Sequence, residues 1–374
     1  MKHLNWKKGI GFGLLFLLLL GATFLILLKD QNPAQLRAAL SQASLPWLLP
    51  GIGCMVVFFL CEAKNIQTGL ALFSSPASYR QCVKYAITGF FFSSVTPSAS
   101  GGQPMQLFAM HRDGHAPAPG AMALLAEFLS FQMAAVTLAC VGFALHWRTL
   151  LGVQEKLWLF FVIGASLNLL IALGLLCAVC SRRLIPSLWK GLMALARRFF
   201  PRRADGWNNW GVKQWEELTL CLDACRTHKK QLAKLFATSL VQLVAYHSVP
   251  FWVYLSFGLS GHSFPAVVGM QAVLFLSVSS LPLPGAVGLS EGGFLLLYQA
   301  LFPATVLSGA MILSRAVSFY LFLAASGIIL AARFLLRLGR SPQTTRPRPV
   351  PPPSLHYAAQ KRLGTRANSH SGGY

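Results

Sequence analysis

Two short segments rich in proline and glycine interrupt long apolar runs, and both carry groups that can bind a charged ligand. The first, residues 96–104, reads Thr-Pro-Ser-Ala-Ser-Gly-Gly-Gln-Pro. Pro104 suits the first turn of a helix, so the amides of residues 101–103 would form a positive helix end that faces an anion. Glycine there lets a phosphate approach the backbone, although glycine and proline can also simply make a tight turn against a neighbouring helix. The candidate binding residues are Thr96, Pro97, Ser98, Gly101, Gly102, Gln103 and Pro104.

The second segment, residues 281–293, reads Leu-Pro-Leu-Pro-Gly-Ala-Val-Gly-Leu-Ser-Glu-Gly-Gly. We expect Ser290 to cap the helix that follows and Glu291 to lie in its first turn. A carboxylate at membrane depth is costly unless it is paired or wet, which makes Glu291 a site candidate. Its carboxylate can bind a cationic headgroup, carry a proton or only cap the helix. The candidate binding residues here are Pro284, Gly285, Gly288, Ser290 and Glu291.

Two further charges stand alone in apolar runs, Glu127 and Arg315. Arg315 follows Glu291 by 24 residues, and Glu127 follows Pro104 by 23 residues, so the two positions correspond. We hypothesise that both face one central cavity, where Arg315 holds a lipid phosphate and Glu127 holds a cation, a proton or Arg315 itself. A purely structural ion pair is the alternative.

Patterns typical of catalysis, cofactors and metals do not account for this sequence. It contains no nucleophile elbow, Walker loop, dinucleotide-binding loop or HExxH motif, so we predict no catalytic residue and no cofactor. The run His-Arg-Asp-Gly-His at 111–115 is expected to be a solvated turn rather than a metal site. The cysteine pairs within 177–180 and 221–225 lack a recognisable zinc-finger context, so no metal is predicted.

Composition places these candidates in a membrane protein. Of 374 residues, 55% are hydrophobic and 11% are charged, and the mean hydropathy is +0.55. The longest polar stretches, residues 181–234 and the tail from Arg333, are too short for an ordinary soluble enzyme core. The net charge of +22 fits cytoplasmic loops beside anionic lipid better than nucleic acid, which we do not expect as a partner.

Hydropathy predicts an all-α integral membrane protein with six full spans and two re-entrant helical hairpins. A run of about 20 apolar residues crosses the hydrocarbon core. The interrupted segments 85–110 and 265–302 have flanks too short to cross and breaks that prolines make unavoidable. The six spans are expected at residues 9–28, 45–60 (continuing towards 73), 119–146, 157–180, 235–257 and 306–332.

Basic residues orient this layout. The amino end, the loop 181–234 and the tail carry 3, 12 and 8 Lys and Arg residues, and six spans place all three on one face. The positive-inside rule makes that face cytoplasmic. We therefore expect a multi-pass protein of the bacterial plasma membrane with both termini in the cytoplasm.

The order span, span, hairpin, span occurs twice, the second time starting from the opposite side. This is the inverted-repeat plan of many transporters, in which broken helices bring a site to the midplane. The order can also arise without a true repeat, because it is inferred from hydropathy alone. The predicted parts are a first repeat, 1–147, a second repeat, 148–335, with its basic cytoplasmic loop, and a disordered cytoplasmic tail, 336–374.

The two interrupted motifs carry a resemblance. The segment 96–104 followed by Met-Gln-Leu-Phe, and the segment 281–294 followed by Arg315 and Tyr320, resemble the flippase-like membrane domain of the lysylphosphatidylglycerol synthase family over residues 9–335. The resemblance implies a flippase that displays aminoacylated phosphatidylglycerol on the outer leaflet and blunts cationic antimicrobial peptides. Many relatives have an acidic residue where Gln103 stands and an arginine near Gln106, which leaves the headgroup open.

The sequence is also compatible with functions other than a flippase. Longer relatives add a cytoplasmic domain that transfers lysine from lysyl-tRNA to phosphatidylglycerol, and no segment of this sequence matches such a domain in size. Related short proteins are linked to polyprenyl-phosphate sugar carriers. A membrane enzyme of lipid modification working through the basic loop, and a scaffold for a separate lipid synthase, are the rivals to a flippase of alternating-access or groove type. Expected partners are the phospholipid or lipid-linked substrate, anionic inner-leaflet lipids, a separate synthase and a second copy of the chain.

Overall fold

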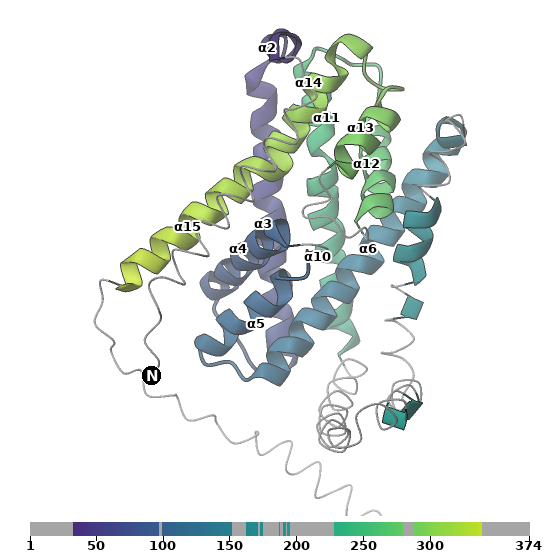
Figure 1. The fold of residues 1–374 in the computed structure, drawn as a ribbon. Coiled ribbons are helices and arrows are strands. Elements are labelled where there is room, and N and C mark those ends of the chain that lie inside the picture. Colours follow the sequence, from purple (N-terminus) through teal and green to yellow (C-terminus); the bar gives the residue numbers. More distant parts are fainter. Residues whose placement is uncertain are drawn as a thin grey trace, which may run out of the picture. The chain divides into compact units, whose positions relative to one another are not determined.

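A computed structural model describes residues 33–96, 99–151, 162–170, 228–279 and 288–338, with a few single helical positions between 173 and 194. Within these ranges every regular element is a helix, as predicted (Figure 1). The described residues up to Arg333 belong to one compact unit, and those from Phe334 belong to a second. The predicted first span, most of the fourth span, most of the basic loop and the tail beyond Leu338 lie outside the described residues.

Four helical stretches in the described ranges are long and apolar enough to cross a membrane: Leu45–Leu72, Pro117–Leu145, Lys229–Ser256 and Ala304–Leu336. Each coincides with a span predicted from the sequence. They are built from the helices η1 (Leu45–Trp47), α3 (Leu48–Leu72), α6 (Pro117–Leu151), α10 (Lys229–His247), α11 (Val249–Ser256), α14 (Ala304–Arg315), the π-helix η4 (Ala316–Tyr320) and α15 (Leu321–Leu338). The short helix α2 (Pro33–Ser41) precedes them.

Two of these stretches are not uniform α-helices. The fifth predicted span divides at Ser248 into α10 and α11, where Pro250 stands in the first turn of α11 and supplies no backbone N–H. The last span continues from α14 into α15 through five residues of π-helix that begin directly after Arg315. Such π segments inside α-helices are frequent at functional sites.

Helical hairpins occupy both interrupted segments. The first consists of α4 (Tyr79–Val95) and α5 (Gly102–Arg112), and a capping box between Ser78 and Gln81 starts α4. The second consists of α12 (Phe264–Val278) and α13 (Leu289–Tyr298). The breaks fall at the predicted places, while the return of each hairpin to its own side and the inverted repeat stay predictions.

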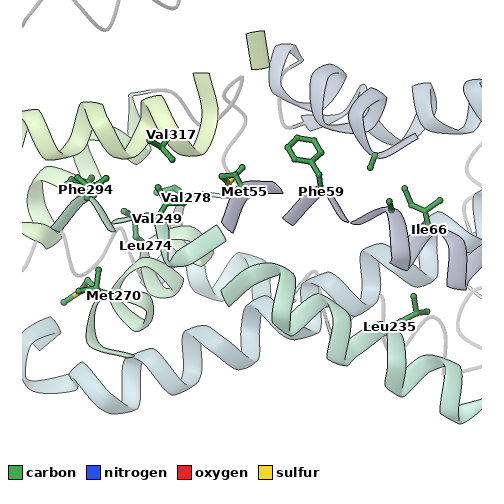
Figure 2. Close-up of a cluster of buried hydrophobic side chains, with 14 of the residues drawn as sticks. Met55, Phe59, Ile66, Leu235, Val249, Met270, Leu274, Val278, Phe294 and Val317 are labelled. Atoms are coloured by element: carbon green, nitrogen blue, oxygen red, sulfur yellow. The ribbon is translucent and has the colours of Figure 1, made fainter. Parts of the chain in front are cut away.

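One apolar core joins the two halves of the chain. Met55, Ile66 and Leu70 of α3 are fully buried in it, and helices from both hairpins contribute to it. Burying these apolar side chains between helices is what holds α3 at the centre of the described elements. Figure 2 shows Met55, Phe59 and Ile66 of α3 with Leu235, Val249, Met270, Leu274, Val278, Phe294 and Val317 from α10, α11, α12, α13 and η4.

Small residues allow close helix crossings, as expected where helices associate inside a membrane. A Cβ on Gly142 of α6 would lie 2.8 Å from Gly269 Cα of α12. A Cβ on Gly69 of α3 would lie 3.0 Å from the Ala123 carbonyl oxygen of α6. These contacts position α6 between α3 and the second hairpin.

Candidate functional site

A buried ion pair lies beside the second hairpin. Arg315 Nε donates to Glu291 Oε1 at 2.7 Å, and the two side chains are 11% and 7% exposed. The other oxygen of Glu291 accepts from the Gly288 backbone N–H at 2.6 Å and from the Ser290 hydroxyl at 3.3 Å. Glu291 therefore caps its own helix with one oxygen and binds the arginine with the other.

The cap of α13 differs from the prediction. Gly288, not Ser290, is the N-cap residue, and Ser290 already lies inside the helix. Gly288 has a φ of 85°, which favours glycine because a Cβ disfavours this region. A cap at Ser290 is predicted from its side chain, whereas the observed cap needs a backbone conformation that glycine adopts readily.

Aromatic side chains surround the arginine. The Arg315 guanidinium lies 4.6 Å from the centre of the Phe319 ring and 5.9 Å from that of Tyr320. Both rings belong to the π-helix, so this local widening positions them beside the charge. Tyr246 of α10 interacts electrostatically with Arg315 and Glu291. The site is thus a charged pair inside an aromatic lining, an arrangement that suits a cation–π contact and a displaceable anion.

Glu127 lies in a second polar group rather than beside Arg315. Its side chain, 6% exposed on α6, is within hydrogen-bonding reach of Glu62 on α3. The carboxylate that pairs with Arg315 is Glu291. The hypothesis that Glu127 and Arg315 face one central cavity stays a prediction.

The second polar group, which we call the Glu62 network, also contains amides from three helices. Gln242 Nε2 of α10 donates to Glu62 Oε2 at 2.8 Å, and Gln106 Nε2 of α5 lies 3.5 Å from Glu62 Oε1. Asn65 Nδ2 donates to Gln242 Oε1 and to Ser239 Oγ, both at 3.1 Å. The residues of the Glu62 network were not predicted from the sequence. Their polar side chains within apolar helices are the signal that could have identified them.

The apex of the first hairpin is a tight, internally bonded turn. Thr96 Oγ1 donates to the Phe92 carbonyl at 2.6 Å and accepts from the Gly101 N–H at 2.8 Å. Gly101 is the N-cap of α5, and Pro104 lies in its first turn as predicted. Gln103 and Pro104 are exposed, whereas Gly102 is buried.

Gly102 has a packing role at this apex. A Cβ there would lie 2.9 Å from the Gly89 carbonyl oxygen of α4, which favours the tight-turn interpretation for this glycine. Pro97 and Ser98 in the first break, and Pro284 and Gly285 in the second, lie outside the described residues.

The turn at 111–115 is packed more closely than the sequence suggested. Asp113 pairs with Lys84 and accepts from the Tyr85 hydroxyl at 2.7 Å. Ser75 Oγ lies 2.8 Å from His115 Nδ1, and burial lowers the pKa of His115. In the described ranges no three His, Cys, Asp or Glu side chains gather as a metal site would require.

The two polar groups are connected by α10. Gln242 donates to Glu62, and Tyr246, one turn further along α10, interacts electrostatically with Arg315 and Glu291. On α3, Phe58 lies one turn before Glu62, and its ring centre is 5.6 Å from that of Tyr246. A shift of α10 against α3 would therefore affect both groups together.

A known protein family matches most of the chain. The family model described as the lysylphosphatidylglycerol synthase TM region matches residues 9–326, which include both hairpins and both polar groups. No curated protein matches the chain.

Proposed function

The chain belongs to the lysylphosphatidylglycerol synthase transmembrane-region family, and from this premise we propose that it is a lipid flippase of the bacterial plasma membrane. Its leading substrate is aminoacylated phosphatidylglycerol, whose display on the outer leaflet would reduce the surface charge that attracts cationic antimicrobial peptides. Synthesis of the lipid would be left to a separate synthase.

The Arg315–Glu291 pair is the observation that carries this proposal. Two charges buried among apolar helices cost free energy unless they satisfy each other, and such residues mark substrate pathways in membrane proteins. The pair joins the start of a broken helix, α13, to a π-helix, which are two irregular elements at one place.

A headgroup with a phosphate and an ammonium group has the charges to replace this pair. Its phosphate would bind Arg315, and its ammonium group would bind Glu291 and the rings of Phe319 and Tyr320. Because the substrate would exchange one ion pair for two, Arg315 and Glu291 would each keep a partner of opposite charge. A polyprenyl phosphate would use the arginine alone.

Reconstitution in liposomes tests the proposal. Lysylphosphatidylglycerol is placed in one leaflet, and its arrival in the other is followed with an impermeant amine-reactive reagent. We expect the wild type to accelerate labelling and Arg315→Gln and Glu291→Gln to abolish the acceleration. Arg333→Gln is the matched control, because it removes an exposed arginine near the end of the same helical stretch.

Two further results separate the rival functions. Acceleration of a polyprenyl-phosphate carrier but not of the phospholipid would reassign the substrate. Lysyl transfer from lysyl-tRNA by the same preparation, without lipid movement, would replace the flippase with a lipid-modifying enzyme.

A further inference from the structure

Two carboxylic groups meet in the Glu62 network without a cation. Glu62 of α3 and Glu127 of α6 lie within hydrogen-bonding reach of each other. None of the ion pairs within the described ranges involves either residue. Two carboxyl groups can form a hydrogen bond only when one of them is protonated, because the ionised form has no donor. A hydrogen bond between Glu62 and Glu127 would therefore contain a proton.

The amides around the pair identify which residue holds this proton. Gln242 presents its N–H₂ group to Glu62, and Gln106 presents the same group from α5. Two amide donors thus point at the Glu62 carboxyl, and this arrangement stabilises its ionised form. Glu127 then supplies the third donor as a neutral carboxylic acid.

An independent observation points to a ligand in the same network. Asn65 is 0% exposed, and its Oδ1 has no hydrogen-bond partner. The amide cannot simply be turned over, because Gln242 directs its carbonyl at Asn65 and so requires the Asn65 N–H₂ group there. A fully buried acceptor without a donor is costly, and a water molecule or a hydrated proton bound there would supply the donor it lacks.

Other charged groups near the pair have partners of their own. On α3, Lys64 donates to Gln67 at 2.8 Å, and on α4, Lys84 pairs with Asp113. Two further titratable side chains are near: Cys61 precedes Glu62 on α3, and Tyr246 lies one turn after Gln242 on α10. On α5 the basic residues stand at the far end, in its last turn. Through residue 145, α6 has no charged residue besides Glu127.

We propose that Glu62 and Glu127 form a proton-binding site that couples lipid movement to the proton gradient. Release breaks the Glu127 O–H bond and transfers the proton to water as hydronium, which leaves two adjacent carboxylates. Their repulsion favours separation of α3 from α6, and Gln242 and Tyr246 on α10 transmit the change to Arg315 and Glu291. The coupling rests on the proposed function, whereas the proton site itself does not.

Infrared spectroscopy of the purified chain, in a detergent without ester groups, tests the proton site. At pH 7 we expect a carbonyl band of a protonated carboxylic acid that is lost in Glu127→Gln, since the introduced amide donates to Glu62 as the acid did. Glu62→Gln should shift the band, because the acceptor of the Glu127 proton changes. Glu291→Gln, which alters an ionised carboxylate, should leave the band in place.

A wild type without this band, or a band that neither Glu127→Gln nor Glu62→Gln changes, would overturn the proton site. The two variants make the test independent of either one failing to fold, and thermal melts identify a variant that has unfolded.

Liposomes with an imposed pH gradient test the coupling. One pH unit offers about a tenfold proton ratio, so the wild-type rate should change by up to about tenfold and return to its basal value with a protonophore. Glu127→Gln should not respond. A wild-type rate of lipid movement that does not change with the pH gradient would overturn the coupling. Absence of lipid movement with any substrate would instead reject the flippase, and the infrared result would still decide the proton site.

Discussion

At the residue scale, two polar groups among the described residues differ in character. Arg315 and Glu291 compensate each other, so their site is neutral before a substrate arrives. Among the described residues neither Glu62 nor Glu127 forms an ion pair, and Glu62 accepts a hydrogen bond from the Gln242 amide. The first group suits exchange of an ion pair for a headgroup, and the second suits gain and loss of a proton.

Breaking the buried ion pair from one side should be more harmful than removing it. Arg315→Gln leaves Glu291 uncompensated, and we expect a loss of about 3–5 kcal/mol in unfolding free energy. The double variant Arg315→Gln, Glu291→Gln should recover much of that loss, because no buried charge is then unpaired. Unfolding of the four proteins in detergent gives the double-mutant cycle. Additive losses would show that the two residues do not stabilise each other.

His115 predicts a pH dependence outside the membrane spans. Burial lowers its pKa, so between the folded pKa and the ordinary value of about 6.5 the unfolded chain binds more protons. Stability should therefore fall as the pH decreases through about 6.5. His115→Asn, which retains an acceptor for Ser75, should flatten this part of the curve. Equal slopes of Tm between pH 5.5 and pH 7.5 in both proteins would contradict the assignment.

At the element scale, glycines and the π-helix determine where the side chains of the site lie. Gly288 begins α13 and aims Glu291 at Arg315, and the π-helix turns Phe319 and Tyr320 towards the guanidinium. In the first hairpin, Gly89 and Gly102 let α4 and α5 touch. Gly89 also leaves room for Gln106, whose amide reaches Glu62.

Adding one methyl group at Gly102 should loosen the first hairpin. Its Cβ would meet the α4 backbone, and overpacking of this kind costs about 1–3 kcal/mol. The matched control is Gly53→Ala in α3, where nothing lies within 4 Å of the new Cβ. Because alanine favours helix by about 1 kcal/mol over glycine, the control should be neutral or stabilising. A Tm unchanged by Gly102→Ala would show that α4 and α5 do not touch there.

At the scale of the whole molecule, much of the described fold follows from hydropathy. Long apolar runs gave four observed helical stretches, and proline and glycine located both breaks. The Glu62 network was not predicted, because Glu62 and Gln242 lie 180 residues apart and composition does not say which helix faces meet. Glu291 and Arg315 were both candidates, but their pairing was not predicted; five residues connect α13 to α14, whose last residue is Arg315.

The basic residues predict the orientation of the chain. With 12 Lys and Arg residues in the loop 181–234, that loop and both termini should be cytoplasmic. A fluorescent protein fused after Tyr374 should fluoresce, and alkaline phosphatase fused at the same place should be inactive. The opposite pair of results would invert the predicted topology.

The initial rate at which lysylphosphatidylglycerol crosses proteoliposome membranes tests the flippase proposal most directly. We predict that wild type and Arg333→Gln accelerate crossing equally and that Arg315→Gln falls to the rate of protein-free vesicles. Arg315→Gln protein that remains folded and moves the lipid as fast as the wild type would contradict the assignment of the buried ion pair as the headgroup site.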